Sequence, residues 1–192
     1  MEPLDAPRCA LVVIDLQRGI VGVPAAPHPG AEVVERAAEL ARAVRAAGGL
    51  VVLVRVTPSP DGKDALHPAS DLPPPGGARP PDWAELVPPL AGLGDLVITK
   101  RQWGAFYGTE LDLQLRRRGV RTIVLCGIST SMGVESTARD AFERGYEQVF
   151  VEDATSARSV EEHEHVMKRV FPRLGRVRSA AEVVAALRGP QG

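Results

Sequence analysis

Three residues of the sequence stand where a catalytic or binding site could form. Each lies at the end of an apolar run or at the start of an amphipathic segment. Asp15 follows the apolar run 9–14, Lys100 follows the run 95–99, and Gly133 heads an amphipathic segment. A carboxyl group can donate or accept a proton when burial and a neighbouring charge tune its pKa. A lysine can hold that carboxylate ionised or bind an anionic substrate, and a helix N-terminus offers N–H groups to negative charge. Together they predict acid–base chemistry on a small anionic molecule.

Short apolar runs alternate with amphipathic segments, which is typical of a parallel sheet covered by helices on both faces. The predicted strands are 9–14, 50–56, 95–99, 122–126, 148–151 and 176–178. The predicted helices are 31–47, 109–118, 133–144, 160–170 and 180–187. We therefore predict one domain, residues 1–192, with a three-layer α/β/α, Rossmann-like architecture and a mostly parallel sheet of about six strands.

The carboxyl ends of parallel strands meet at one edge of a sheet. Asp15, Lys100 and the loop that follows the fourth run at Gly127 are therefore expected to share one pocket. The segment 57–81 follows the second run and holds eight prolines and three glycines. Such a segment cannot form a regular element, and a loop of this length usually serves a site or is mobile.

The overall composition argues against several classes of partner. A formal net charge of −1 gives no field that would attract nucleic acid or an anionic membrane. The apolar runs are too short to span a bilayer, and the acidic start of the chain lacks the positive region of a signal peptide. Cys9 and Cys126 lie in apolar runs and are expected to be buried free thiols. We expect a cytoplasmic protein that acts on a small molecule.

Four blocks of sequence resemble the isochorismatase-like hydrolases, also called the cysteine hydrolase superfamily. They are LVVIDLQ around Asp15, ITKRQWGAFYGTELDLQL around Lys100, IVLCGISTSMGVESTARDAFERGY around Gly133, and the closing FPRLGRVRSAAEVV. The resemblance implies a hydrolase with a parallel sheet, a homodimer or larger homo-oligomer, and a catalytic triad of Asp, Lys and Cys. Asp15 and Lys100 match the first two triad positions. Gly133 occupies the third, because the family pattern places Cys just before Val-Glu-Ser-Thr.

Without a sulfur at Gly133, thioester formation is not available at this position. The family's isochorismatases resemble this chain in carrying Gly there, and they cleave a vinyl ether rather than an amide. By this resemblance Asp15 would protonate the enol carbon, while Lys100 would orient the acid and hold a substrate carboxylate. Backbone N–H groups near Ser129 and Gly133 would bind polar substrate atoms, and a cis peptide bond is implied before Ser129. Ser131 stands where isochorismatases usually carry His, so the substrate stays open.

Several further residues are candidates for binding substrate. Trp103 and Phe106 follow Lys100 and either line the pocket or pack against the next helix, with Trp103 the stronger candidate for a substrate face. Ser131 is a further binding candidate and a conceivable nucleophile. However, its surroundings do not match the Gly-x-Ser-x-Gly pattern, and no histidine is placed by sequence to serve as its base.

The sequence predicts neither a metal nor another cofactor. Some amidases of the family bind a metal through an Asp-x-His pair, and Asp61-Gly62-Lys63 breaks that pair here, although His28 and His67 also lie in loops. The residues His163 and His165 are two apart on a predicted helix, hence on different faces, and are expected to be solvated.

Two alternatives to vinyl-ether hydrolysis remain. The missing cysteine is consistent with a catalytically silent member kept for binding or assembly, although Asp15, Lys100 and the GISTSMG loop are all present. Amide hydrolysis without cysteine, by direct attack of water or through Ser131, is the other alternative.

Overall fold

The computed structural model describes residues 2–72 and 79–187. Its centre is a six-stranded sheet in the order β3-β2-β1-β4-β5-β6, and every neighbouring pair is parallel. The strands are β1 (Cys9–Ile14), β2 (Leu50–Val56), β3 (Leu96–Lys100), β4 (Thr122–Ile128), β5 (Glu147–Ser156) and β6 (Arg176–Arg178). The predicted parallel sheet of about six strands is therefore confirmed.

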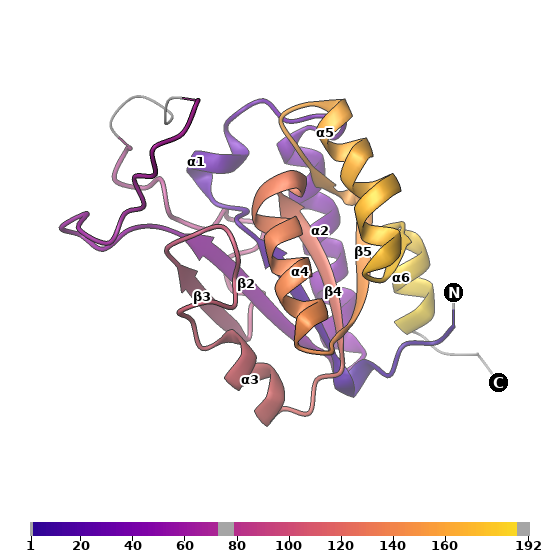
Figure 1. Ribbon diagram of the computed structural model, residues 1–192. Helices are drawn as coiled ribbons and strands as arrows, with labels where there is room; N and C mark the ends of the chain where they lie inside the picture. The colour runs from indigo at the N-terminus through magenta and orange to yellow at the C-terminus, as the bar shows by residue number, and fades with distance from the viewer. Residues whose placement is uncertain (1, 73–78, 188–192) are drawn as a thin grey trace.

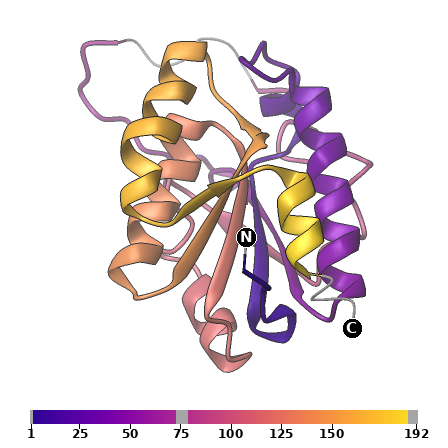
Figure 2. The ribbon, with the colours of Figure 1, turned by 90° about the vertical axis from the view of Figure 1, so that its right-hand side faces the viewer.

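Helices cover both faces of the sheet and make it the middle of three layers (Figures 1 and 2). The helices are α1 (Arg18–Val21), α2 (Gly30–Ala46), α3 (Leu111–Arg117), α4 (Glu135–Glu143), α5 (Val160–His165) and α6 (Ala180–Leu187). Helices α2 and α6 pack on one face, whereas α4 and α5 pack on the other (Figure 2). The predicted α/β/α architecture is confirmed.

The apolar run of β1 explains why this strand lies inside the sheet. All six of its residues are buried. Leu11 and Val13 belong to the apolar cluster beneath α2 and α6, whereas Val12 and Ile14 belong to the cluster beneath α4. Side chains alternate between the two faces of a strand, so only a continuous apolar run satisfies a strand covered on both sides. This burial carries the end of β1, and with it Asp15, into the interior.

The strand ends differ from the sequence prediction at three places. Lys100 is the last residue of β3 instead of the residue that follows it. Strand β4 continues through Gly127 to Ile128, with Gly127 at φ 121°, and β5 is longer than the predicted 148–151. The register between β4 and β5 shifts after Leu125, and this irregularity lets polar residues continue β5 towards the site edge.

The helix predicted from 133 to 144 also begins differently. A π turn, Thr130–Val134, precedes α4, so Gly133 lies inside a helical turn and is buried instead of heading the helix. Helix α5 likewise continues into a π turn, Val166–Val170. The short α1 was not predicted; four residues carry too little periodic signal.

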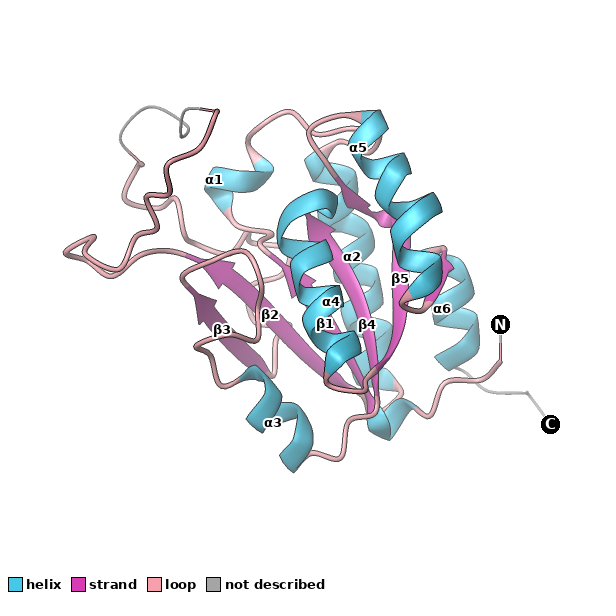
Figure 3. Cartoon of the chain, viewed as in Figure 1, coloured by secondary structure: helices cyan, strands magenta, loops and turns pink. Residues whose placement is uncertain are grey.

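The proline-rich segment is irregular as predicted wherever it is described, from 57 to 72 and from 79 to 81 (Figure 3). Three of its prolines, at 73–75, lie outside the described residues. Among residues 2–72 and 79–187, none of the helices combines the length and the apolar character needed to cross a membrane.

Candidate active site

Asp15 and Lys100 meet inside the molecule. The Lys100 ammonium donates a hydrogen bond from Nζ to Asp15 Oδ2 at 2.7 Å, and the two residues are 4% and 1% exposed. The same ammonium donates to the backbone carbonyl of Trp103, also at 2.7 Å. The ends of the first and third apolar runs thus meet at one edge of the sheet, as their positions in a parallel sheet predict.

The turn after β1 directs the Asp15 side chain towards Lys100. Asp15 has φ 54°, in the left-handed region, and its N–H donates to the carbonyl of Val54 on the neighbouring strand. Gln17 stabilises the turn from inside the protein. Its side-chain NH2 donates to the carbonyls of Val56 and Trp83, and its side-chain oxygen accepts from the N–H of Val56. Sequence reasoning missed Gln17, because nothing in a lone glutamine after a strand shows that it is buried.

The charge state of Asp15 follows from its surroundings. Burial raises the pKa of the carboxyl to about 6, and the adjacent Lys100 ammonium opposes part of that rise. Oδ2 is bound to Lys100, whereas the buried Oδ1 has no hydrogen-bond partner among the residues that the structure describes. Asp15 therefore presents one oxygen that can exchange a proton near neutral pH.

Gly133 lies directly against this pair. A Cβ atom built on Gly133 would stand 3.1 Å from Asp15 Oδ2, 3.3 Å from Lys100 Nζ and 3.0 Å from the Cγ2 atom of Ile14. Because Gly133 has no side chain, its own atoms do not press on the Asp–Lys pair from the side of the π turn. The turn is held in place by Thr137, whose hydroxyl donates to the carbonyl of Gly133 at 2.6 Å and accepts from the N–H of Ala105 at 3.1 Å.

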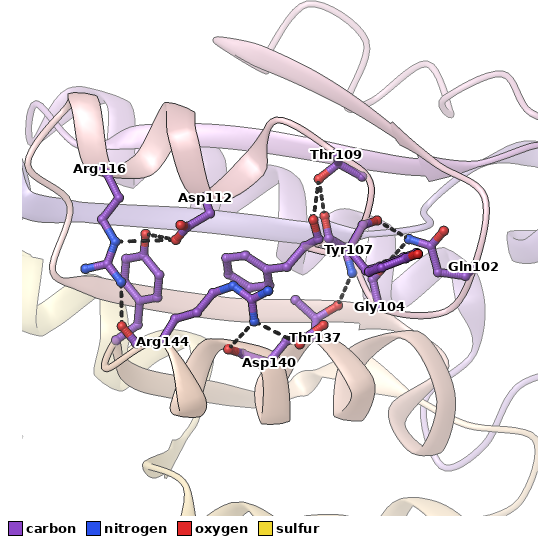
Figure 4. Close-up of polar contacts among 12 residues, drawn as sticks. Gln102, Gly104, Tyr107, Thr109, Asp112, Arg116, Thr137, Asp140 and Arg144 are labelled. Atoms are coloured by element: carbon purple, nitrogen blue, oxygen red, sulfur yellow. Dashed lines mark hydrogen bonds and ion pairs between the residues drawn. The ribbon is translucent and has the colours of Figure 1, made fainter.

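The segment that supplies the Trp103 carbonyl is held by polar contacts within itself and by the hydrogen bond from the N–H of Ala105 to Thr137 on α4 (Figure 4). The Gln102 side chain donates to the carbonyls of Gly104 and Tyr107. The hydroxyl of Thr109 donates to the carbonyl of Ala105 at 2.5 Å. Farther from Trp103, Tyr146 donates to Asp112 on α3, and Arg144 pairs with Asp140 on α4 (Figure 4). The bonds of Gln102 and Thr109 fix the backbone around Trp103, whose carbonyl accepts from Lys100.

The two aromatic candidates lie in different surroundings. Trp103 is 61% exposed, and its carbonyl accepts the hydrogen bond from Lys100. Phe106 lies in the core, 5.9 Å between ring centroids from Tyr146, with the Arg144 guanidinium over its face. Phe106 therefore takes the packing role that was the alternative in the sequence prediction.

The loop between β4 and α4 holds the two serine candidates. The peptide bond between Ile128 and Ser129 is cis, as the family resemblance implied. Ser129 is buried, its carbonyl accepts from the N–H groups of Met132 and Val134, and its hydroxyl has no partner in the described part of the chain. The hydroxyl of Ser131 donates to Glu162 at 3.3 Å, so its partner is a carboxylate and no histidine.

The prediction that both helix histidines are solvated was wrong for His163. This residue is 1% exposed, and its Nδ1 is 2.9 Å from the hydroxyl of Thr130, whereas His165 is exposed as expected. Spacing along a helix gives the relative direction of two side chains, and only packing tells which direction is inward. Cys9 and Cys126 are buried, and burial raises the pKa of each thiol to about 12, so neither is available as a thiolate nucleophile.

The residues just after the proline-rich segment contact the turn that follows Asp15. The carbonyl of Trp83 accepts from Gln17, and the Trp83 ring fills the space above Gly19. The segment also borders a hollow of about 480 Å³ whose lining includes Arg55 and Arg101, but neither Asp15 nor Lys100.

Comparison with known proteins agrees with this arrangement. The family model described as the isochorismatase domain matches residues 9–182. The isochorismatase family protein YecD of Escherichia coli O157:H7 is 52% identical over 188 residues, which cover 97% of this chain and 100% of that protein.

Two solved structures extend the comparison. An isochorismatase family protein from Burkholderia thailandensis superposes with a TM-score of 0.92 at 47% identity, covering 98% of this chain and 99% of the other. N-carbamoylsarcosine amidase from Thermoplasma acidophilum gives a TM-score of 0.71 at 29% identity, covering 90% and 96%. With its fold, its buried Asp–Lys pair and a family match over most of its length, the chain belongs to the isochorismatase family of hydrolases.

Proposed function

We propose that this hydrolase cleaves a vinyl ether in a small carboxylated metabolite of the isochorismate type, with Asp15 as the general acid. One observation carries the proposal. The Asp15 carboxyl is buried, one of its oxygens is held by Lys100, and the other has no partner among the described residues. A carboxyl with a pKa of about 6 in such a setting is partly protonated near neutral pH, which general acid catalysis requires.

In the proposed reaction the proton of Asp15 moves to the terminal carbon of the enol ether, and an oxocarbenium ion forms. Water adds to the carbon that bears the ether oxygen and gives one proton back to the Asp15 carboxylate. The resulting neutral hemiketal collapses to pyruvate and the released alcohol. Lys100 orients the carboxyl and attracts the substrate carboxylate. The Ser129 hydroxyl, which has no partner among the described residues, and backbone N–H groups near Ser129 and Gly133 bind other polar atoms of the substrate.

The residue at position 133 distinguishes the proposed reaction from amide hydrolysis through a cysteine thioester. A side chain at this position would begin 3.1 Å from Asp15 Oδ2, so a cysteine there would stand against the acid and the lysine. The glycine cannot form a thioester, and it leaves room for a substrate atom beside the carboxyl. Cys126 does not replace the thiol, because it lies on β4 and is fully buried.

The test is pyruvate release from isochorismate, measured with wild type and with Asp15→Asn. General acid–base groups typically contribute 10²–10⁴-fold, so we expect kcat to fall by roughly that factor. Cys126→Ala is the matched control, since it removes a buried thiol outside the site, and it should retain wild-type kcat. Equal turnover by wild type and Asp15→Asn would contradict the assignment of Asp15. Absence of product from wild type at high enzyme concentration would instead favour a silent, binding member of the family.

A second candidate function is hydrolysis of an amide by direct attack of water. The similarity to N-carbamoylsarcosine amidase favours it. The pH dependence of kcat/KM separates the two, because the carboxyl has a pKa of about 6 in the free enzyme. As the proton donor to a vinyl ether, Asp15 makes kcat/KM fall above that pH. As the base that activates water, it makes kcat/KM fall below that pH.

The proposal also includes a homodimer or larger assembly and a cytoplasmic location, both of which follow from the expectations drawn from the sequence. Light scattering during size-exclusion chromatography measures the mass of the assembly. A monomer at micromolar concentration would contradict the first of these expectations.

A further inference from the structure

A second group of polar side chains gathers on the other side of Thr130. His28 comes from the loop before α2, Glu152 from β5, and His163 from α5. Each offers one ligand atom, and the three atoms all lie within 4.8 Å of one another. The loop of His28 is tied to β5, since its N–H donates to the hydroxyl of Ser156 at 3.2 Å. Three separate elements therefore converge on this point.

The spacing of the ligand atoms matches a small tetrahedral cation. Bonds of about 2.0–2.1 Å at tetrahedral angles place neighbouring ligand atoms about 3.3–3.4 Å apart. The Glu152 carboxylate oxygen Oε1 is 3.5 Å from Nε2 of His28 and 3.4 Å from Nε2 of His163. The cation would therefore sit between the carboxylate and the two imidazoles, whose ligand atoms all lie within 4.8 Å of one another.

His163 supplies an independent sign that a ligand belongs here. Its side chain is almost wholly buried, yet Nε2 forms no hydrogen bond within the described residues, although it lies close to Glu152. An unsatisfied buried nitrogen destabilises the folded state, because it has lost its hydrogen bond to water. The other ring nitrogen is held by the hydroxyl of Thr130. Metal-binding histidines normally have such an outer partner, which fixes the ring and leaves the free nitrogen pointing at the metal.

We propose that His28, Glu152 and His163 form a binding site for a divalent transition metal of the Zn²⁺ type. Two imidazoles and one carboxylate are ligands that Zn²⁺ accepts readily, whereas Ca²⁺ and Mg²⁺ prefer oxygen alone. The side chains of His28 and Glu152 are 21% and 43% exposed, so a fourth ligand from solvent has access.

The site differs from the Asp61-based arrangement considered in the sequence, with which it shares only His28. It is also separate from the Asp15–Lys100 pair. Thr130 nevertheless connects the two regions, because it stands directly after Ser129 and begins the π turn that contains Gly133. A bound metal would fix His163 and, through the Thr130 hydroxyl, the start of that turn.

The test is Zn²⁺ titration of the tag-free protein after removal of metal by a chelator, followed by calorimetry and by competition with a chromogenic chelator. We expect one Zn²⁺ per chain in wild type. Glu152→Gln and His28→Gln both change partly exposed side chains, and each should weaken binding at least tenfold. Thr130→Val removes the outer partner and should weaken binding by about 10–100-fold. His165→Gln, an exposed histidine on the same helix, is the matched control and should bind as wild type does.

Co²⁺ provides a second readout that does not depend on activity. A tetrahedral Co²⁺ site with imidazole ligands absorbs strongly in the visible range, and we expect this band in wild type and not in Glu152→Gln. Absence of stoichiometric Zn²⁺ binding to wild type would overturn the proposal. Equal binding by wild type, Glu152→Gln and His28→Gln would also overturn it, since the metal would then be held elsewhere.

Discussion

Two groups of polar side chains lie near the loop between β4 and α4, and they differ in how far they are enclosed by the protein. In the first, the opposite charges of Asp15 and Lys100 lie 2.7 Å apart and are almost fully enclosed. In the second, His163 is enclosed but its partners His28 and Glu152 are partly open to solvent. Within the described part of the chain, Asp15 Oδ1 is the one side-chain atom of the first group without a hydrogen bond, and His163 Nε2 of the second group also has none.

The difference indicates what each group can do. A buried ion pair is costly to break, because removal of one partner leaves the other charge without solvent. It therefore holds the Asp15 carboxyl in one position. A half-open group with an unsatisfied nitrogen can accept a ligand from solvent without unfolding. Three predictions test this difference between the two groups, in decreasing order of expected effect.

Lys100→Met should destabilise the protein by about 3–5 kcal/mol, because it leaves the Asp15 carboxylate buried without a partner. The loss should be larger at pH 8 than at pH 5, since protonation of the carboxyl removes the unpaired charge. Urea denaturation at both pH values measures the free energy of unfolding. Glu152→Gln in metal-free protein is the control and should cost less than about 1 kcal/mol, as for an exposed pair. Equal losses of unfolding free energy in the two variants would contradict the proposed difference between the two groups.

The stability of wild type should depend on pH through Asp15. The pKa is about 6 in the folded protein, above the ordinary 3.8, so the folded state binds this proton more tightly than the unfolded state does. The resulting stabilisation is complete below pH 4 and is lost as the pH rises through about 6, with a total of about 3 kcal/mol.

The measurement compares the unfolding free energies of wild type and Asp15→Asn between pH 4 and pH 7. Wild type should lose the larger amount over that window. A parallel pH dependence in both proteins would show that another group titrates there.

Gly133→Ala should cost about 1–3 kcal/mol and reduce turnover, because the added methyl group would press on Ile14 and on both members of the Asp–Lys pair. Ser131→Ala, two residues away in the same turn and only partly buried, should stay within about 0.5 kcal/mol of wild type. Thermal unfolding measures the loss of stability in each of the two variants. Tolerance of alanine at 133 would mean that the turn can move away from the acid.

The sequence predicted the first group far better than the second. Asp15 and Lys100 stand at the ends of apolar runs, and parallel strand ends share an edge, so one topological rule brings them together. His28, Glu152 and His163 come from a loop, from a strand extended beyond its apolar core and from a helix. No periodicity connects these three, and the inward direction of His163 is set by packing beside Thr130.

The local errors have a common physical origin. The sequence predicted a helix N-terminus at Gly133, but a π turn begins earlier, at Thr130. The glycine and small polar residues of this stretch do not indicate π geometry. The length of β5 was underestimated because its second half carries charged and polar residues that the register shift accommodates. Similarly, Phe106 was a candidate for the pocket and lies in the core, since an aromatic residue near a site has the same sequence signature in either role.

Gln17 has a consequence for how this molecule can change over evolution. Its single amide is bonded to Val56, just before the proline-rich segment, and to Trp83, just after it. Both boundaries of that segment are thus pinned to the turn that aims Asp15, whatever the number of residues between them. Insertions, deletions and substitutions in that stretch can therefore change its length and composition while the orientation of the Asp15 side chain stays the same.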